Sequence, residues 1–328
     1  MKKSVLLVVF LTFSSYVFCQ VIKGTVSDVM DKKPVQFAYV YIGGTMVGTN
    51  TDSDGFFKLD ISNYPGIPLT ISAIGYYQFT LKDYPKSEPV KVFMTPKVVE
   101  LQEVVVSDKS LAGTRKANLK LFRSAFLGNT VNGSLSVILN EDEIHFIYDG
   151  SDTLKAYSTE PLKIKNMGLG YIVTYFLEEF EYDRRSDSFY FLGNILFDED
   201  MGNDESVRQK FDRRREASYK GSRMHLLREL WNNHLDLTGF QLEDSKGNRI
   251  TYEEIVEDDG GTNKYLWYPE NLTVYYQLSE PAGEIYFKDE PVYFDKSGYF
   301  DPFNLIWGGN ISNQRIGDWL PYEYSLPK

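Results

Sequence analysis

Residues 22–57 read IKGTVSDVMDKKPVQFAYVYIGGTMVGTNTDSDGFF, and this stretch specifies the architecture of the first domain. Ile22, Gly24 and Val26 alternate with polar residues, which is the period-two pattern of a half-buried strand. Short apolar runs follow, separated by segments whose Gly, Pro and Asp residues turn the chain. The further predicted strands are Ala38–Ile42, Phe56–Ile61, Leu69–Ala73 and Val90–Met94. Several short strands with frequent turns indicate a β-sandwich.

The same stretch carries a family signature in its Gly, Asp and Pro positions. These positions are Gly24, Asp28, Pro34, Ala38, Val40, Gly43-Gly44-Thr45, Gly48-Thr49, Thr51-Asp52 and Asp54-Gly55-Phe56. Their order resembles the carboxypeptidase-D regulatory-like domain. The resemblance implies a non-catalytic, transthyretin- or Ig-like β-sandwich over residues 20–106, of the kind that accompanies enzymes and receptors of the cell envelope.

Asp52 and Asp54 stand on one of the predicted loops, where alternate carboxylates can converge on a calcium ion. The remainder of an EF-hand loop is missing, including the acidic residue that closes it. The simpler interpretation is a hairpin turn with Gly55 at positive φ. We therefore expect no metal here, and Asp52 and Asp54 remain weak candidates for one.

The amino-terminal residues 1–19 have the pattern of a signal peptide. Lys2 and Lys3 precede an apolar run, Val5–Phe13, that is too short to cross a bilayer as a helix. Cleavage before Gln20 is expected, and lipid attachment at Cys19 is the alternative. The resemblance places such a protein in the periplasm or at the outer membrane, and no later stretch is apolar enough to predict a transmembrane helix.

Composition excludes several classes of function. Cys19 is the only cysteine, so the mature chain has no disulfide, thiol nucleophile or cysteine-ligated metal. Loss of the two lysines at positions 2 and 3 would change the net charge from −11 to −13. Such an acidic chain argues against nucleic acid as a partner.

Residues 107–118 are polar and predict a linker, and residues 119–328 form a second region. Several segments of this region are similar to an uncharacterised module in Bacteroidota envelope proteins that carry the regulatory-like domain in front. They include Leu169-Gly170-Tyr171, the residues from Arg215 to Arg228, and Leu320-Pro321-Tyr322-Glu323-Tyr324. No activity comes with this resemblance.

The pattern of residues 119–328 predicts an α+β domain with an antiparallel sheet, so the chain as a whole is expected to be mainly β. Ala117–Phe126 predicts a helix, and Glu205–Asn233 predicts a longer helical stretch interrupted at Gly221. Aromatic and β-branched runs predict the strands. These runs are Ser134–Leu139, His145–Tyr148, Ile172–Leu177, Phe180–Tyr182, Phe189–Leu192, Thr273–Leu278, Gly283–Phe287 and Val292–Phe294.

The densest polar cluster lies on the longer helical stretch and offers candidate ligand-binding residues. They are Arg213, Arg214, Arg215, Tyr219, Ser222, His225 and Arg228. Guanidinium groups bind carboxylates and phosphates with two parallel hydrogen bonds, so a site for an acidic ligand is one interpretation. Ion pairing with the acidic segment Glu199–Glu205 is the alternative, and it is the commoner arrangement.

No peptidase motif accompanies the regulatory-like domain. The three histidines, His145, His225 and His234, do not start the spacings that zinc peptidases use. No Gly-x-Ser-x-Gly elbow or phosphate-binding loop is present either. No cofactor is expected, and a hydrolase with an unrecognised site around His225 and Glu229 is the less favoured hypothesis.

The leading hypothesis is a non-catalytic exported protein of the cell envelope. Its sandwich would serve as an interaction or spacer module, and its second region would recognise an envelope protein or a surface ligand. The alternative is a carbohydrate-binding protein that stacks sugars on exposed aromatic rings. The rings that distinguish the two are Trp231, Trp267, Trp307 and Trp319.

Overall fold

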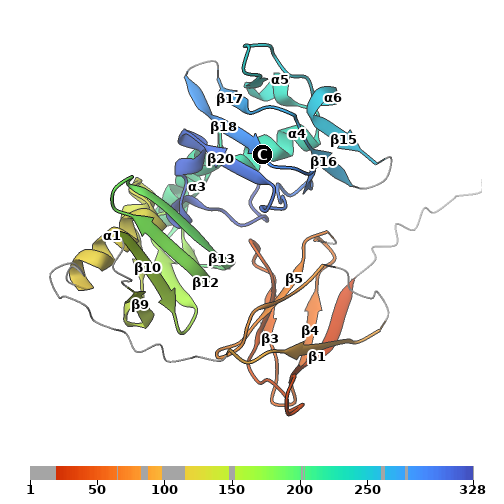
Figure 1. Ribbon diagram of the computed structural model, residues 1–328, viewed down its shortest axis with the longest axis vertical. Helices are drawn as coiled ribbons and strands as arrows, with labels where there is room; N and C mark the ends of the chain where they lie inside the picture. The colour runs from red at the N-terminus through yellow and green to blue at the C-terminus, as the bar shows by residue number, and fades with distance from the viewer. Residues whose placement is uncertain are drawn as a thin grey trace, which may run out of the picture.

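The computed structural model describes residues 20–64, 66–82, 88–97, 115–147, 152–200, 202, 204–259, 263–277 and 280–327. The predicted signal peptide, with Cys19, and most of the predicted linker lie outside these ranges. Figure 1 shows three parts around a common centre: a sandwich, a central sheet and a carboxyl-terminal part. In the described ranges, no helix has the length and apolar character that crossing a membrane requires.

The first part is a sandwich of two sheets, as predicted. One sheet has the strand order β4-β1-β7 and the other β3-β2-β5-β6. Alternate residues of β1 point inward, and Ile22 and Val26 are buried in the core between the sheets. The strands are β1 (Val21–Asp28), β2 (Tyr39–Ile42), β3 (Gly48–Asn50), β4 (Phe56–Asp60), β5 (Leu69–Ser72), β6 (Phe79–Leu81) and β7 (Val90–Met94).

The turn at Asp52 differs from the prediction in one respect. Gly55 has φ +72°, as expected, and the Asp52 carboxylate accepts the backbone N–H groups of Asp54 and Phe56 at 2.9 and 2.8 Å. The prediction of a hairpin was wrong, because β3 and β4 belong to different sheets. The turn therefore carries the chain from one layer of the sandwich to the other, and the Asp52 side chain stabilises that crossing.

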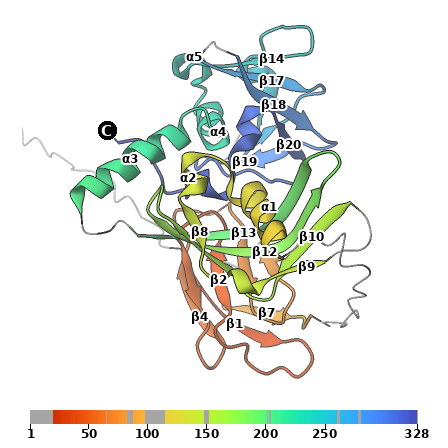
Figure 2. The same ribbon diagram turned by 90° about the vertical axis from the view of Figure 1, so that its left-hand side faces the viewer.

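The central part is a six-stranded antiparallel sheet with α1 (Arg115–Leu127) on one face (Figure 2). Helix α1 begins within the stretch predicted as a linker. Its Phe122 and Phe126 are fully buried and lie 4.6 Å from Phe180 and 4.9 Å from Tyr175, measured between ring centroids. The strands are β8 (Ser136–Ile138), β9 (Ile144–Ile147), β10 (Thr153–Ser158), β11 (Leu162–Asn166), β12 (Tyr171–Asp183) and β13 (Ser188–Glu199).

The third part has its own hydrophobic core, separate from that of the central sheet. It contains a four-stranded sheet, β14-β17-β18-β20, and a three-stranded sheet, β15-β16-β19. Its strands are β14 (Phe240–Glu243), β15 (Val256–Asp258), β16 (Lys264–Leu266), β17 (Leu272–Tyr276), β18 (Pro281–Phe287), β19 (Val292–Phe294) and β20 (Leu305–Gly308). Residues 119–328 thus contain two hydrophobic cores, where the sequence indicated one α+β domain.

Helices α3 (Glu205–Tyr219) and α4 (Arg223–Trp231) lead from the central sheet into the third part. They are separated at Gly221, which has φ +75°, so the predicted interruption is confirmed. The Ser222 hydroxyl caps α4 by accepting the His225 N–H at 3.1 Å. The shorter helices are α2 (Val131–Ser134), α5 (Leu235–Thr238), α6 (Tyr252–Ile255), and the 3₁₀ turns η1 (Glu141–Glu143), η2 (Asn310–Asn313) and η3 (Ile316–Asp318).

Backbone hydrogen bonds fix the sandwich against the central sheet. The turn between β2 and β3 lies along β13, where the Gly44 N–H donates to the Ile195 carbonyl at 2.8 Å and the Phe197 N–H donates to the Thr45 carbonyl at 2.9 Å. The Gly44 carbonyl accepts the Tyr322 N–H at 2.9 Å. The carboxyl-terminal segment therefore binds the same turn, and the three parts meet at Gly44.

Apolar contact reinforces this junction. The Tyr41 ring is stacked on Phe176 of β12 at 4.5 Å between centroids, and Leu196 packs beside them. Phe176 faces the sandwich, whereas its neighbours Tyr175 and Leu177 face the core beneath α1. The central sheet is therefore covered on both faces, by α1 on one and by the sandwich on the other (Figure 2).

Candidate functional site

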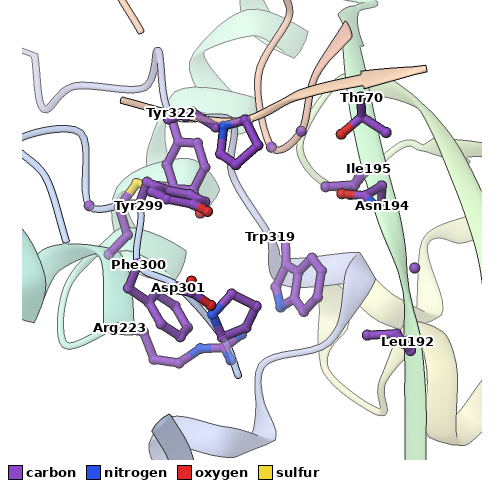
Figure 3. A pocket seen from close by; sticks show the side chains of 18 of the residues that line it. Thr70, Leu192, Asn194, Ile195, Arg223, Tyr299, Phe300, Asp301, Trp319 and Tyr322 are labelled. Atoms are coloured by element: carbon purple, nitrogen blue, oxygen red, sulfur yellow. The ribbon is translucent and has the colours of Figure 1, made fainter. Parts of the chain in front are cut away.

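A cavity of about 760 Å³ lies where the three parts meet, and each part supplies one wall. The sandwich contributes residues from β5 and β6 and from the glycine turn, including Thr70. Strand β13 contributes the segment from Leu192 to Ile195, and the third wall is formed by residues from the start of α4 and from two loop segments, 298–303 and 314–322. Figure 3 shows the cavity with Trp319 near its centre.

Aromatic side chains form much of the third wall. Tyr299, Phe300, Trp319 and Tyr322 all line the cavity (Figure 3). The Trp319 indole N–H donates to the Gln314 carbonyl at 3.3 Å, which fixes the orientation of the ring. Burial raises the pKa of the Tyr299 and Tyr322 hydroxyls well above the usual range. These rings therefore stay neutral and present flat surfaces to the cavity.

Arg223, the first residue of α4, is the cationic group on this wall. Its guanidinium lies 5.5 Å from the Trp319 ring centroid. Across the residues that the structure describes, no hydrogen bond or ion pair to another side chain or carbonyl reaches it. Burial, together with repulsion from Arg315, lowers the pKa of Arg223 to about 10. At neutral pH the cavity therefore contains a charged guanidinium that has no hydrogen-bond or ion-pair partner among the described residues.

Three carboxylates also line the cavity, and each is held by its own neighbours. Asp301 pairs with Lys82 at 3.3 Å. The Asp318 carboxylate accepts hydrogen bonds from the Thr130 hydroxyl and the Asn132 amide, and burial raises its pKa. Burial also raises the pKa of Glu178, and the nearby Lys97, Gln78 and Asn194 side chains oppose that shift.

The raised pKa values of Glu178 and Asp318 meet one condition for acid–base chemistry, namely perturbed carboxyl groups in a cavity. Glu178 belongs to β12 and Asp318 to η3, on different walls. The hydrogen bonds that Asp318 accepts from Thr130 and Asn132 tie the carboxyl-terminal segment to α2. That arrangement gives Asp318 a positioning role in the fold.

The arginines named as candidate ligand-binding residues donate to backbone carbonyls of the protein itself. Arg215 is buried, donates to the carbonyls of Leu169 and Gly170 at 2.8 and 3.2 Å, and pairs with Glu199 at 3.2 Å. Arg214 donates to the Gly168 carbonyl at 3.4 Å, on the same loop. The alternative expectation is that these arginines form ion pairs with the acidic segment Glu199–Glu205, and Arg215 forms such a pair with Glu199.

Arg228 binds carbonyls near the carboxyl terminus, whereas Arg213 bonds only to a carbonyl of its own helix. The three guanidinium nitrogens of Arg228 donate to the carbonyls of Ser297, Tyr324 and Tyr322 at 2.8, 2.7 and 3.1 Å. Arg213 is exposed and donates only to a carbonyl of its own helix, at 3.3 Å, within the described residues. Arg228 thus anchors the carboxyl-terminal segment that forms the third wall.

Tyr219, Ser222 and His225 pack together at the junction of α3 and α4. The rings of Tyr219 and His225 lie 4.7 Å apart, and His225 Nδ1 accepts the Gly221 N–H at 3.1 Å. Burial, with Arg228 and Lys220 nearby, lowers the pKa of His225 to about 4, although the Glu229 carboxylate lies 3.7 Å from Nε2. The neutral imidazole therefore serves as an acceptor that stabilises the turn.

The four tryptophans are all half-buried. Trp231 packs edge-on against Phe294 and Trp307 against Phe300. Trp319 lines the cavity. The glycan hypothesis predicts exposed aromatic rings on which sugars can stack, and none of the four rings is fully exposed.

Trp319 and Ser222 are among the candidates that the sequence indicates, whereas Arg223, Tyr299 and Phe300 are not. Arg223 stands in the same polar stretch as Arg215 and Arg228, and the sequence gives no means of telling a paired guanidinium from an unpaired one. No group of three His, Cys, Asp or Glu side chains in the described ranges is arranged to hold a metal ion.

The CarboxypepD_reg-like domain family matches residues 22–106. Those residues include all of the sandwich strands except Val21, the first residue of β1, so the predicted regulatory-like domain is confirmed and the first wall of the cavity belongs to it. No curated protein matches the chain.

Proposed function

We propose that this protein is a non-catalytic, exported component of the cell envelope that binds a ligand in the cavity between its three parts. The main observation behind the proposal is that all three parts of the protein form the cavity. The regulatory-like sandwich, the central sheet and the third part each supply one wall. Ligand sites commonly lie at such junctions between domains, where concave surface is largely preformed.

The contacts of the sandwich favour a role in binding over a role as a spacer. A spacer needs few contacts with its neighbours, whereas this sandwich is bound through backbone hydrogen bonds at Gly44 and Thr45 and through the Tyr41–Phe176 stack. The same turn, Gly43-Gly44, lines the cavity. Fixing the sandwich therefore fixes one wall of the binding site.

The signal-peptide pattern at residues 1–19 and the envelope setting of similar sandwiches support export. The regulatory-like family is not a peptidase family, which supports a non-catalytic role. Glycan binding is the second candidate, because Trp319 presents an aromatic ring inside the cavity. A ring in a cavity suits a small sugar or a chain end, and an extended polysaccharide fits it less well.

Native mass spectrometry of the full chain, purified from its own host, tests the binding proposal. We expect a bound small molecule, and we expect Leu192→Trp to displace it because Leu192 lines the cavity. Tyr190→Trp is the matched control, since Tyr190 lies on the same strand but is exposed outside the lining. The proposal fails if the purified chain is empty and Leu192→Trp also leaves binding of added fragments unchanged.

Fractionation of the same host tests export separately. We expect the chain in the periplasmic or outer-membrane fraction, shortened by residues 1–19. Full-length protein in the cytoplasmic fraction would overturn the envelope assignment without affecting the test of the cavity.

A further inference from the structure

The arginines near the α3–α4 junction divide into two kinds. Arg215 and Arg228 have their guanidinium groups occupied by backbone carbonyls, and Arg215 also pairs with Glu199. Arg223 lines the cavity beside the Trp319 ring and makes no such bond to any residue that the structure describes. A guanidinium has five N–H donors, so Arg223 retains its full capacity for an acceptor supplied from outside.

We propose that Arg223 binds the carboxylate of a ligand whose body is a ring, either aromatic or a sugar, packed against Trp319. This inference rests on the proposed function, since it names the ligand class of the same cavity. A carboxylate matches the planar fork of a guanidinium with two parallel hydrogen bonds. The aromatic surfaces of Tyr299, Phe300 and Trp319 provide the apolar contact for the ring (Figure 3).

The other cations that line the cavity, Lys82 and Lys97, belong to the wall that the sandwich supplies and not to the wall of Trp319. Asp301 is paired with Lys82, and Asp318 accepts hydrogen bonds from Thr130 and Asn132. Neither lies within ion-pair distance of Arg223. Arg315 lies near Arg223, and its positive charge interacts with the Asp318 carboxylate.

The position of Arg223 on its helix also favours binding of an anion. It follows the cap residue Ser222 at the start of a nine-residue helix, and Ser222 and Met224 also line the cavity. The positive end of a helix dipole favours an anion. A carboxylate beside Arg223 would therefore be attracted by the side chain and by the first turn of α4 together.

Arg223 is half-buried, so its charge is partly removed from water without a hydrogen-bonding partner, which disfavours the charged form. A ligand carboxylate would supply the missing partner, so binding is expected to discriminate strongly in favour of the anion. Charged hydrogen bonds of this kind correspond to about a tenfold to a hundredfold difference in affinity.

The experiment compares matched acids and neutral analogues by isothermal titration with the full chain. Indole-3-acetate and indole-3-acetamide represent an aromatic ring, and glucuronate and glucose represent a sugar ring. We expect at least one acid to bind about tenfold more tightly than its neutral analogue. The pair that shows this difference identifies whether the ring is aromatic or a sugar.

The Arg223→Gln variant tests the residue itself. It should abolish the preference for the acid, whereas Arg213→Gln, at an exposed site outside the cavity, should leave it unchanged. Equal binding of acid and neutral analogue, or an acid preference that survives in Arg223→Gln, overturns this inference and leaves the cavity as a binding site. Failure of all four probes to bind, with Leu192→Trp also without effect on co-purified material, overturns the proposed function as well.

Discussion

Replacing Arg228 with methionine should lower the free energy of unfolding by about 3 kcal/mol, whereas the same change at Arg223 should not lower it. Arg228 donates to three carbonyls at 2.7 to 3.1 Å, and charged hydrogen bonds contribute about 1.5–3 kcal/mol each when buried. Arg228 is half-buried, so water replaces part of what is lost and the sum is discounted to about 3 kcal/mol.

The expectation for Arg223 has the opposite sign. Burial lowers the pKa of Arg223 to about 10, which means that the fold disfavours its charged form. Methionine retains an apolar chain similar in length to the aliphatic part of arginine and carries no charge, so stability should be unchanged or should rise by about 1 kcal/mol. Arg213→Met is the control, because that side chain is exposed and should change stability by less than about 0.5 kcal/mol.

Urea denaturation of the three variants, followed by circular dichroism at pH 7, measures these differences. A loss at Arg223 as large as that at Arg228 would refute the reasoning, since it would mean that Arg223 has a partner in the folded protein. A negligible loss of unfolding free energy in Arg228→Met would refute the claim that Arg228 stabilises the fold, because water would then satisfy the three carbonyls equally well.

The remaining predictions concern pH, the junction and the core. Lowering the pH from 7 to 4.5 should reduce the free energy of unfolding by about 2 to 3 kcal/mol more in the native protein than in His225→Asn. The reason is that the pKa of His225 falls from 6.5 to about 4 on folding, so the unfolded chain takes up the proton at a higher pH than the folded protein does. Urea titrations at both pH values measure this, and equal losses would contradict it. Gly44→Ala should destabilise the protein by about 1–3 kcal/mol more than Gly75→Ala. Both residues have positive φ, but only at Gly44 would the new Cβ meet the Tyr322 ring, at 2.4 Å. Equal shifts in the thermal unfolding temperature of the two variants would contradict this contact. Phe122→Ala should cost about 3–5 kcal/mol by denaturant titration, since the ring is fully buried, and a cost below about 1 kcal/mol would contradict its place in the core.

The sequence predicted the sandwich well because its strands are local features. The alternation at Ile22, Gly24 and Val26 and the turn residues at Asp52 and Gly55 act over a few positions, and the structure contains them. Strands β3 and β6 were missed, since three residues each are too few to show a period. The long strand β12 was predicted as two pieces because a bulge at Leu177 and Glu179 breaks its alternation.

The candidate site could not be predicted in the same way, because the cavity depends on contacts between residues far apart in the chain. Gly44 meets Tyr322, and Arg228 meets Tyr322 and Tyr324, across separations that no local pattern encodes. The Leu320–Tyr324 segment was recognised from a resemblance, but its role of joining the three parts appears only in the fold.

These contacts between distant residues also link ligand binding to the arrangement of the three parts. Tyr322 lines the cavity, and its backbone is bound by Gly44 of the sandwich and by Arg228 of α4. A ligand that binds only when all three walls are in place stabilises the assembled state and not the separated parts. Ligand occupancy and docking of the sandwich are then coupled, and each must strengthen the other by the same factor. A carboxylate ligand that protects the native protein from proteolysis should therefore protect Gly44→Ala less, even though Gly44 is remote in sequence from Arg223.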